Sequence, residues 1–125
     1  MVRGIGVDII EIARIRESID QHGNTFLDRI FTPREITYCT AKQNRYQHFA
    51  ARFAAKEAVS KALSTGWTGE FTWRDVEVDN DDLGKPHIAL HGKLREKLSG
   101  CAVHVSISHD QSHVVAMALI EELSV

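Results

Sequence analysis

The chain has 125 residues and a mass of 14.0 kDa, which predicts one domain over residues 1–125, because two independent hydrophobic cores need a longer chain. Its 15 basic and 17 acidic side chains give a formal charge of −2, which argues against nucleic-acid or anionic-membrane binding, since both require an excess of basic residues. Two cysteines are too few for a disulfide framework or a four-cysteine zinc site. No apolar run approaches the roughly 18 residues of a membrane span, so we expect a soluble, cytoplasmic protein.

The charge is unevenly distributed along the chain. Residues 1–74 hold 11 basic and 8 acidic side chains, whereas residues 75–125 hold 4 and 9. An acidic partner would therefore dock on the first half. We interpret the acidic residues between positions 75 and 82 as solvated strand-end and loop residues, because charged runs usually keep loops in water; they are Asp75, Glu77, Asp79, Asp81 and Asp82.

Residues 4–8 alternate Ile5 and Val7 with two glycines and Asp8, a period of two that predicts a short strand. One face of this strand carries almost no side chains, so another group must approach it closely. From Asp8 onward the apolar residues follow a helical spacing, which predicts a helix that ends near Gly23. A lone carboxylate at such a junction commonly caps the helix, so Asp8 is either an N-cap or a ligand.

The next segments predict two helices of unequal length. Thr32, Pro33 and Glu35 have the residue types and spacing of a helix start with a capping box, and this short helix should run to about Lys42. Residues 45–64 contain no Gly or Pro and are rich in Ala, Leu, Lys and Glu, so they should form the best helix of the molecule.

The second half predicts mainly strands. Residues 74–78 and 87–90 alternate like strands, and the turn-forming residues between them predict a hairpin. A short helix should follow over residues 92–99. Residues 103–108 alternate again, and residues 114–120 are apolar on both faces, as in a central strand. The predicted fold class is α+β, with an antiparallel sheet packed against one long helix.

The long helix distributes its charges unusually. At about 100° per residue, Arg52 and Lys56 share one arc, while Glu57 and Lys61 share another about 140° away. A simple solvated face would collect its charges in one arc. Either the two pairs face different surroundings, such as two sides of an elongated anionic ligand, or both are ordinary surface pairs.

Two kinds of metal site are compatible with the residues. Asp8 and Glu57 together would give a hard oxygen site suited to Mg²⁺, and nearby Lys and Arg side chains then favour a phosphate ester or anhydride as substrate. Three imidazoles, from His104, His109 and His113, could instead hold zinc. His104 and His109 would point to opposite faces of an extended strand, which weakens the zinc alternative.

Four segments resemble the small phosphopantetheinyl transferases, the family that includes the holo-acyl-carrier-protein synthases. They are GIGVDIIEIARI at 4–15, FAARFAAKEAVSKAL at 49–63, GKPHIAL at 84–90 and HVSISH at 104–109. The resemblance implies Mg²⁺-dependent transfer of phosphopantetheine from coenzyme A to a serine of apo acyl carrier protein, with release of adenosine bisphosphate, in fatty acid biosynthesis. It also implies a homotrimer with active sites between subunits.

The same resemblance assigns roles to individual residues. Asp8 and Glu57 resemble the magnesium ligands, and Glu57 and Lys61 the catalytic pair, with Lys61 beside the diphosphate. The residues leave open whether Glu57 or a water molecule accepts the serine proton. The positions that resemble coenzyme A contacts are Arg52, Lys56, Pro86 and His109, of which Arg52 and His109 are the better candidates for phosphate. Arg14, with its neighbour Arg16, matches the surface where the acidic carrier protein docks.

Three residues depart from the family pattern. Ser64 and Trp67 follow the long helix where the family commonly has a glycine and an aliphatic residue, and Asp110 stands where a carboxylate would repel phosphate.

The residues leave two other functions open: a magnesium-dependent phosphohydrolase, and a non-enzymatic trimer that binds coenzyme A or the carrier protein. A pure binder of polyanions would have little use for two carboxylates.

Overall fold

The structure, a computed structural model, describes residues 1–63 and 71–123. The elements in chain order are β1 (Val2–Glu11), α1 (Ile12–His22), α2 (Asn24–Ile30), α3 (Pro33–Thr40), α4 (Arg45–Leu63), the 3₁₀ turn η1 (Trp73–Asp75), β2 (Val76–Asn80), β3 (Pro86–Leu90), α5 (Gly92–Lys97), β4 (Cys101–His109) and β5 (His113–Glu122). No helix within these ranges has both the length and the apolarity that a membrane span needs.

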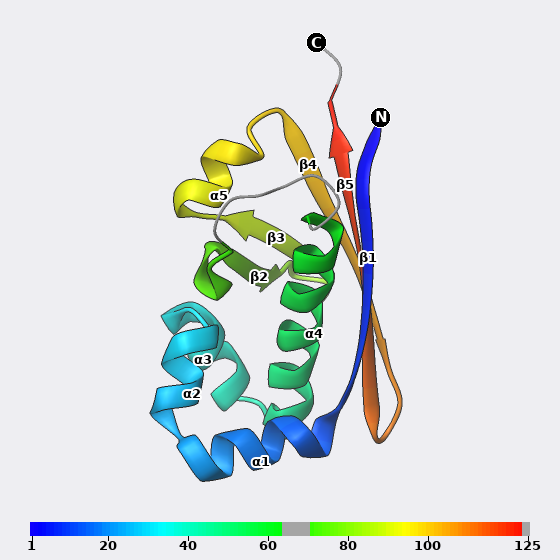
Figure 1. The fold of residues 1–125 in the computed structure, drawn as a ribbon. Helices are drawn as coiled ribbons and strands as arrows, with labels where there is room; N and C mark the ends of the chain where they lie inside the picture. The colour runs from blue at the N-terminus through cyan, green and yellow to red at the C-terminus, as the bar shows by residue number, and fades with distance from the viewer. Residues whose placement is uncertain (64–70, 124–125) are drawn as a thin grey trace.

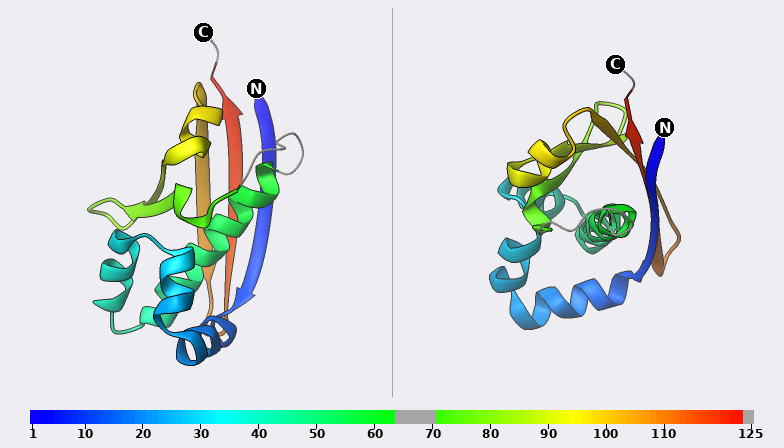
Figure 2. Two further views of the ribbon diagram at one scale, coloured as in Figure 1. Left: turned by 60° about the vertical axis from the view of Figure 1, so that its left-hand side comes forward. Right: turned by 45° about the horizontal axis from the view of Figure 1, so that its top comes forward.

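The long helix α4 stands at the centre of the fold (Figures 1 and 2). A three-stranded antiparallel sheet in the order β1-β5-β4 covers one side of it, and the hairpin β2-β3 lies with α3 on the other side. The end-on view of α4 shows α1 closing the ring between β1 and α2. The α+β prediction is confirmed, and so is the central position of the last strand.

The first strand is longer than the sequence predicts. β1 continues to Glu11 and α1 begins only at Ile12, because Ile9 and Ile10 still pair with Val115 and Val114 of β5. Asp8 therefore lies inside the sheet and does not cap the helix. The predicted helix end at Gly23 is confirmed: its φ is 52° and its N–H donates to the carbonyl of Ile19.

At Gly4 and Gly6, α4 approaches the sheet so closely that β1 has no room for a side chain. A Cβ at Gly6 would lie 2.0 Å from the carbonyl oxygen of Ala58, and one at Gly4 would lie 2.1 Å from that of Ala62. The close approach predicted for this face is confirmed, but the group that approaches is the backbone of a helix. Asp8 follows on the same face of the strand, so the same contact brings its carboxylate to α4.

The helices between β1 and α4 are only partly predictable. The capping box of α3 is present, with Thr32 and Glu35 bonded reciprocally, but α3 ends at Thr40. Helix α2 was not predicted; it begins directly after Gly23 with no side-chain cap. The predicted end of α4 and the departures at Ser64 and Trp67 lie outside the described residues.

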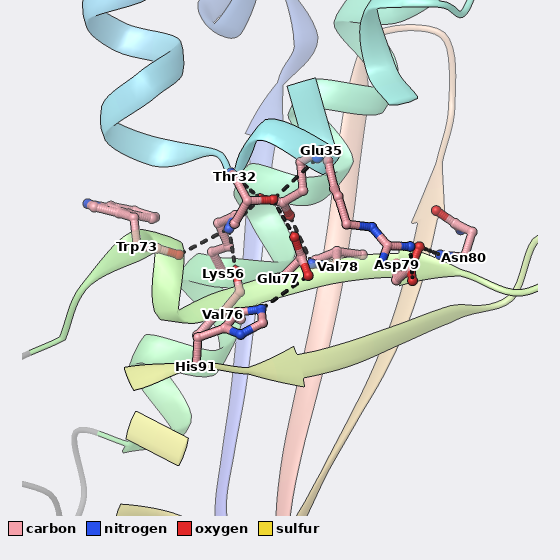
Figure 3. A network of polar contacts seen from close by, with 11 residues as sticks. Thr32, Glu35, Lys56, Trp73, Val76, Glu77, Val78, Asp79, Asn80 and His91 are labelled. Atoms are coloured by element: carbon pink, nitrogen blue, oxygen red, sulfur yellow. Dashed lines mark hydrogen bonds and ion pairs between the residues drawn. The ribbon is translucent and has the colours of Figure 1, made fainter. Parts of the chain in front are cut away.

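A buried ion pair joins α4 to α3 and β2 (Figure 3). The Lys56 ammonium is completely buried, 2.8 Å from Oε1 of Glu35, and it donates to the carbonyls of Trp73 and Val76. Glu35 in turn accepts from the backbone N–H of Thr32 and Val78. Burial lowers the pKa of Lys56, and the negative charge of Glu35 opposes that shift. The assignment of Lys56 as a coenzyme A contact is therefore corrected, because its ammonium faces the protein interior.

Glu77 corrects a second expectation. It is 7% exposed and not solvated, because Thr32 Oγ1 donates to one carboxylate oxygen and His91 Nε2 lies 3.1 Å from the other (Figure 3). Burial acts to raise the pKa of Glu77, but these two hydrogen bonds outweigh it and lower the pKa below its usual value. One polar network thus connects α3, α4, β2 and the start of α5.

Replacing Lys56 tests this structural role. Lys56→Met should lower the free energy of unfolding by about 3–5 kcal/mol, because it leaves the buried Glu35 carboxylate without a counter-charge. Urea denaturation followed by circular dichroism measures the loss. Lys85→Met, at an exposed position, is the matched control and should change stability by less than about 0.5 kcal/mol.

A second variant separates charge from packing. Glu35→Gln combined with Lys56→Met should recover part of the loss, because no unpaired charge then remains buried. Parent-like stability of Lys56→Met alone would contradict the interior role.

Candidate functional site

Two carboxylates and one lysine meet where α4 crosses β1. Asp8 comes from β1, while Glu57 and Lys61 lie one turn apart on α4. The Lys61 ammonium is 3.0 Å from Oδ1 of Asp8 and donates to the carbonyl of Val7 at 3.3 Å. We call Asp8, Glu57 and Lys61 the carboxylate site.

The electrostatics show that the two carboxylates share one environment. Burial raises the pKa of Glu57, the negative charge of Asp8 raises it further, and Lys61 acts in the opposite direction. Two neighbouring carboxylates disfavour each other's ionised form unless a cation lies between them. Asp8 and Glu57 are therefore close enough for the charge of Asp8 to affect the ionisation of Glu57.

The donor set fits Mg²⁺. Two carboxylate oxygens are hard ligands, and Mg²⁺ normally completes its shell with waters and substrate phosphates. Among residues 1–63 and 71–123, no group of three or more His, Cys, Asp or Glu side chains could hold a metal. Within these ranges the three histidines proposed as zinc ligands therefore do not form a metal-binding group. His104 is hydrogen-bonded to Glu121, His109 contacts Gln47 and His113 contacts Ser112.

A cleft of about 640 Å³ opens at the carboxylate site and follows α1. Asp8 and Glu57 line it together with Arg14, and Phe26 and Phe53 supply apolar walls. A ligand in this cleft would meet carboxylate oxygens at one place and apolar side chains at another. This combination suits a substrate that is charged in one part and apolar in another.

The structure separates the two predicted docking arginines. Arg14 lines the cleft. Arg16 lies elsewhere on α1, 3.8 Å from Asp20 and over the ring of Tyr46 at 5.3 Å. Of the two arginines, Arg14 is the one that lines the cleft.

A second group of polar residues lies on the other side of α4. Arg52 donates to Oδ1 of Asn80 at 2.7 Å, and Asn80 pairs with Pro86 in the β2-β3 hairpin. His109 Nε2, at the end of β4, is 2.9 Å from Nε2 of Gln47. Three of the four predicted coenzyme A contacts, Arg52, Pro86 and His109, therefore belong to this second group of polar residues.

Positive charge is concentrated in this second group. Burial lowers the pKa of His48, and the charges of Arg52, Lys42 and His109 lower it further. We call Lys42, Arg52 and His109 the cationic cluster; His48 lies among them, and its lowered pKa favours its neutral form. Sequence analysis missed Lys42 and His48. His48 lies one helical turn before Arg52, and this spacing could have indicated that the two side chains are neighbours.

The two charged arcs of α4 face different surroundings, as one of the two interpretations predicted. Lys61 and Glu57 interact with Asp8 of β1, whereas Lys56 and Arg52 interact with α3 and β2. Arg52 is 3% exposed and Lys56 0%, so the interpretation as ordinary surface pairs is wrong for them.

The departure at Asp110 has a local explanation. Its Oδ1 accepts from the backbone N–H groups of Ser112 and His113, both at 2.8 Å, and these bonds hold the pKa of the carboxyl below its usual range. Asp110 therefore builds the β4-β5 turn. Its negative charge is partly satisfied by that turn.

Comparison with known proteins identifies the family. The model of the 4′-phosphopantetheinyl transferase superfamily matches residues 4–118. A holo-acyl-carrier-protein synthase from Koribacter versatilis is 46% identical over 125 residues, covering 98% of this chain and all of the relative. One from Geobacter sp. (strain M21) is 47% identical over 124 residues, covering 97% and 99%.

Solved structures agree with these relatives. The Neisseria meningitidis holo-acyl-carrier-protein synthase superposes with a TM-score of 0.85 at 34% identity, covering 97% of this chain and 99% of that one. The Bacillus anthracis synthase, described as a complex with CoA (3′,5′-ADP), gives 0.81 at 39% identity and 98% coverage of both chains. The chain is therefore an enzyme that belongs to the 4′-phosphopantetheinyl transferase superfamily, and within it to the holo-acyl-carrier-protein synthases.

Proposed function

We propose that this enzyme transfers the phosphopantetheine group of coenzyme A to a serine of apo acyl carrier protein, releases adenosine 3′,5′-bisphosphate, and depends on Mg²⁺ held by Asp8 and Glu57. The observation that carries the proposal is that two carboxylates, Asp8 and Glu57, line one cleft, and that Lys61 is paired with Asp8. Relatives described as coenzyme A complexes support the choice of substrate. The reaction would serve fatty acid biosynthesis.

The reaction is a phosphoryl transfer. The serine oxygen would form a bond to the phosphorus that bears pantetheine, the anhydride P–O bond would break with adenosine bisphosphate as the leaving group, and the serine proton would pass to Glu57 or to a water molecule. Mg²⁺ supplies charge neutralisation for the diphosphate when it is bound. Lys61 lies beside Asp8, where its ammonium would stabilise the negative charge that develops on the leaving phosphate.

The carrier protein would dock along α1. Arg14 lines the cleft and is exposed, so its guanidinium is available to an acidic partner. The carrier's serine must reach the carboxylate site, and the cleft provides the connection between that site and α1.

The site would be completed by a second copy of the chain. In one chain the carboxylate site and the cationic cluster lie on different sides of α4. One coenzyme A molecule would therefore bind the carboxylate site of one subunit and the cationic cluster of its neighbour. Self-association is supported by the outer face of the sheet, where apolar residues lie in register across β1 and β5. Ile5, Val7 and Ile9 of β1 and Met117 and Val115 of β5 are exposed, and Leu119, opposite Ile5, is half-buried. We propose a homotrimer, as the family resemblance implies.

Removing either carboxylate should abolish transfer. Asp8→Asn and Glu57→Gln should each lower kcat/KM by about a thousandfold, because each removes a metal ligand. Intact-mass analysis of apo carrier protein incubated with coenzyme A and Mg²⁺ measures the gain of phosphopantetheine, and a chelator should prevent it.

Asp28→Asn, at an exposed position outside the cleft, is the control for these variants and should react like the parent. Parent-like turnover of either carboxylate variant would contradict the metal assignment. Release of adenosine bisphosphate without mass gain on the carrier would indicate a hydrolase.

Charge reversal tests the docking surface. Arg14→Glu should raise KM for the carrier protein about tenfold, through repulsion of an acidic partner, and leave KM for coenzyme A nearly unchanged. Arg16→Glu should have a smaller effect, because Asp20 already neutralises Arg16. Equal increases in both KM values for Arg14→Glu would place this residue outside the docking surface.

The oligomer can be tested on the outer sheet face. Met117→Glu puts a charge at the centre of that face and should convert the trimer to monomers and abolish transfer, because a buried unpaired charge opposes association. Light scattering at micromolar concentration measures the mass. Leu83→Glu is the matched control: Leu83 is 95% exposed but lies in the β2-β3 turn. A monomeric, fully active parent would rule out the shared site.

A further inference from the structure

Helix α1 presents a continuous polar stripe to the cleft. Arg14, Glu17, Ser18 and Gln21 all line the cleft, and their spacing of three, four and seven residues places them on one face of the helix. The Ser18 hydroxyl donates to the carbonyl of Arg14 at 3.1 Å, so it is bonded within the helix. Arg14 and Glu17, one turn apart, carry the charges of this face. We call these four residues the α1 stripe.

The two charges of the α1 stripe are opposite in sign, but they are not paired with each other. Side chains three residues apart on a helix are neighbours and can form an ion pair. The ion pairs within residues 1–63 and 71–123 include neither Arg14 nor Glu17, and both residues are exposed. On the other face of the same helix, Arg16 does pair with Asp20. Helix α1 therefore leaves one cation and one anion available to a binding partner on the side that borders the cleft.

The cleft does not suit a uniformly acidic partner. Its lining includes the carboxylates of Asp8, Glu11, Glu17 and Glu57. Among the described residues of this lining, Arg14 is the one arginine or lysine. A divalent cation would compensate Asp8 and Glu57, but it would leave Glu11 and Glu17 beside a single arginine. A partner segment whose charges are all negative would be attracted at Arg14 and repelled at Glu17.

We propose that Glu17 is a specificity residue for the carrier protein: the α1 stripe docks a carrier helix whose acidic side chain meets Arg14 and whose lysine or arginine, one turn away, meets Glu17. This rests on the proposed function, in which the carrier docks along α1. A helix suits the stripe because its side chains three or four residues apart have the same spacing as Arg14 and Glu17. A carrier with a second acidic side chain opposite Glu17 would be rejected by like-charge repulsion.

A charge swap between enzyme and carrier tests the proposal. In the acyl carrier protein of the same organism, each lysine and arginine is replaced by glutamate in turn, and calorimetry measures the binding of every apo carrier to the parent enzyme and to Glu17→Lys. Glu17→Lys should bind the unchanged carrier about tenfold more weakly than the parent does. One carrier variant should bind the parent about tenfold more weakly, and Glu17→Lys should restore the affinity of that variant alone.

Two enzyme variants serve as controls. Glu96→Lys makes the same charge change at an exposed position of α5, and it should bind every carrier as the parent does. Glu17→Gln removes the charge without reversing it, so it should weaken binding of the unchanged carrier about threefold. If Glu17→Lys binds the unchanged carrier as tightly as the parent does, or restores none of the carrier variants, Glu17 meets no basic side chain and the proposal is overturned.

Measuring binding without coenzyme A and Mg²⁺ separates this inference from the proposed function. Restoration by the charge swap supports the role of Glu17 even if no phosphopantetheine reaches the carrier. Transfer without restoration overturns the role of Glu17 and leaves the proposed function intact, whereas a parent enzyme that binds no carrier overturns both.

Steady-state kinetics distinguish docking from catalysis. Glu17→Lys should raise KM for the carrier protein about tenfold and leave kcat and KM for coenzyme A near those of the parent. A fall in kcat with an unchanged KM for the carrier would contradict a docking role for Glu17.

Discussion

The contact between the backbone of α4 and the side-chain-free face of β1 is the constraint on which the site depends. Gly4 and Gly6 admit the carbonyls of Ala62 and Ala58 at distances that a Cβ would prevent. Small residues on both elements bring the helix axis unusually close to the sheet. Asp8, the next residue on that face, is thereby brought within reach of Lys61 and into the electrostatic environment of Glu57. The chemistry of the carboxylate site is a consequence of packing that begins several residues earlier.

The opposite side of α4 is held by polar instead of apolar contacts. Lys56 and Glu35 form an ion pair inside the protein, and backbone groups satisfy their remaining hydrogen-bonding capacity. A fully bonded pair of this kind adds little stability relative to apolar residues, but it allows few alternative arrangements. It fixes the rotation of α4 relative to α3 and β2, and thereby the direction in which Arg52 points.

Much of the fold follows from local sequence. The capping box at Thr32, the glycine end at Gly23 and the long helix from Arg45 are predictable because neighbouring residues determine them. The limits of β1 are not predictable from neighbouring residues, since Ile9 and Ile10 fit the apolar stripe of a helix as well as a strand. Only pairing with Val115 and Val114 of β5, more than 100 residues later in the chain, decides between the two. For the same reason sequence analysis could not place Lys56 or Glu77 in the interior, because their partners come from other elements.

Helix α4 contributes residues to both charged groups of the enzyme, and this arrangement limits how the gene can vary in length. An inserted or deleted codon within α4 would rotate everything beyond it by about 100°, and so would separate Glu57 and Lys61 from β1 or Arg52 from Asn80. The turn between β2 and β3 is under no such restriction, since residues 81–85 are all exposed. Insertions and deletions among natural variants of this protein should therefore occur mainly in the turn between β2 and β3 and be absent from α4.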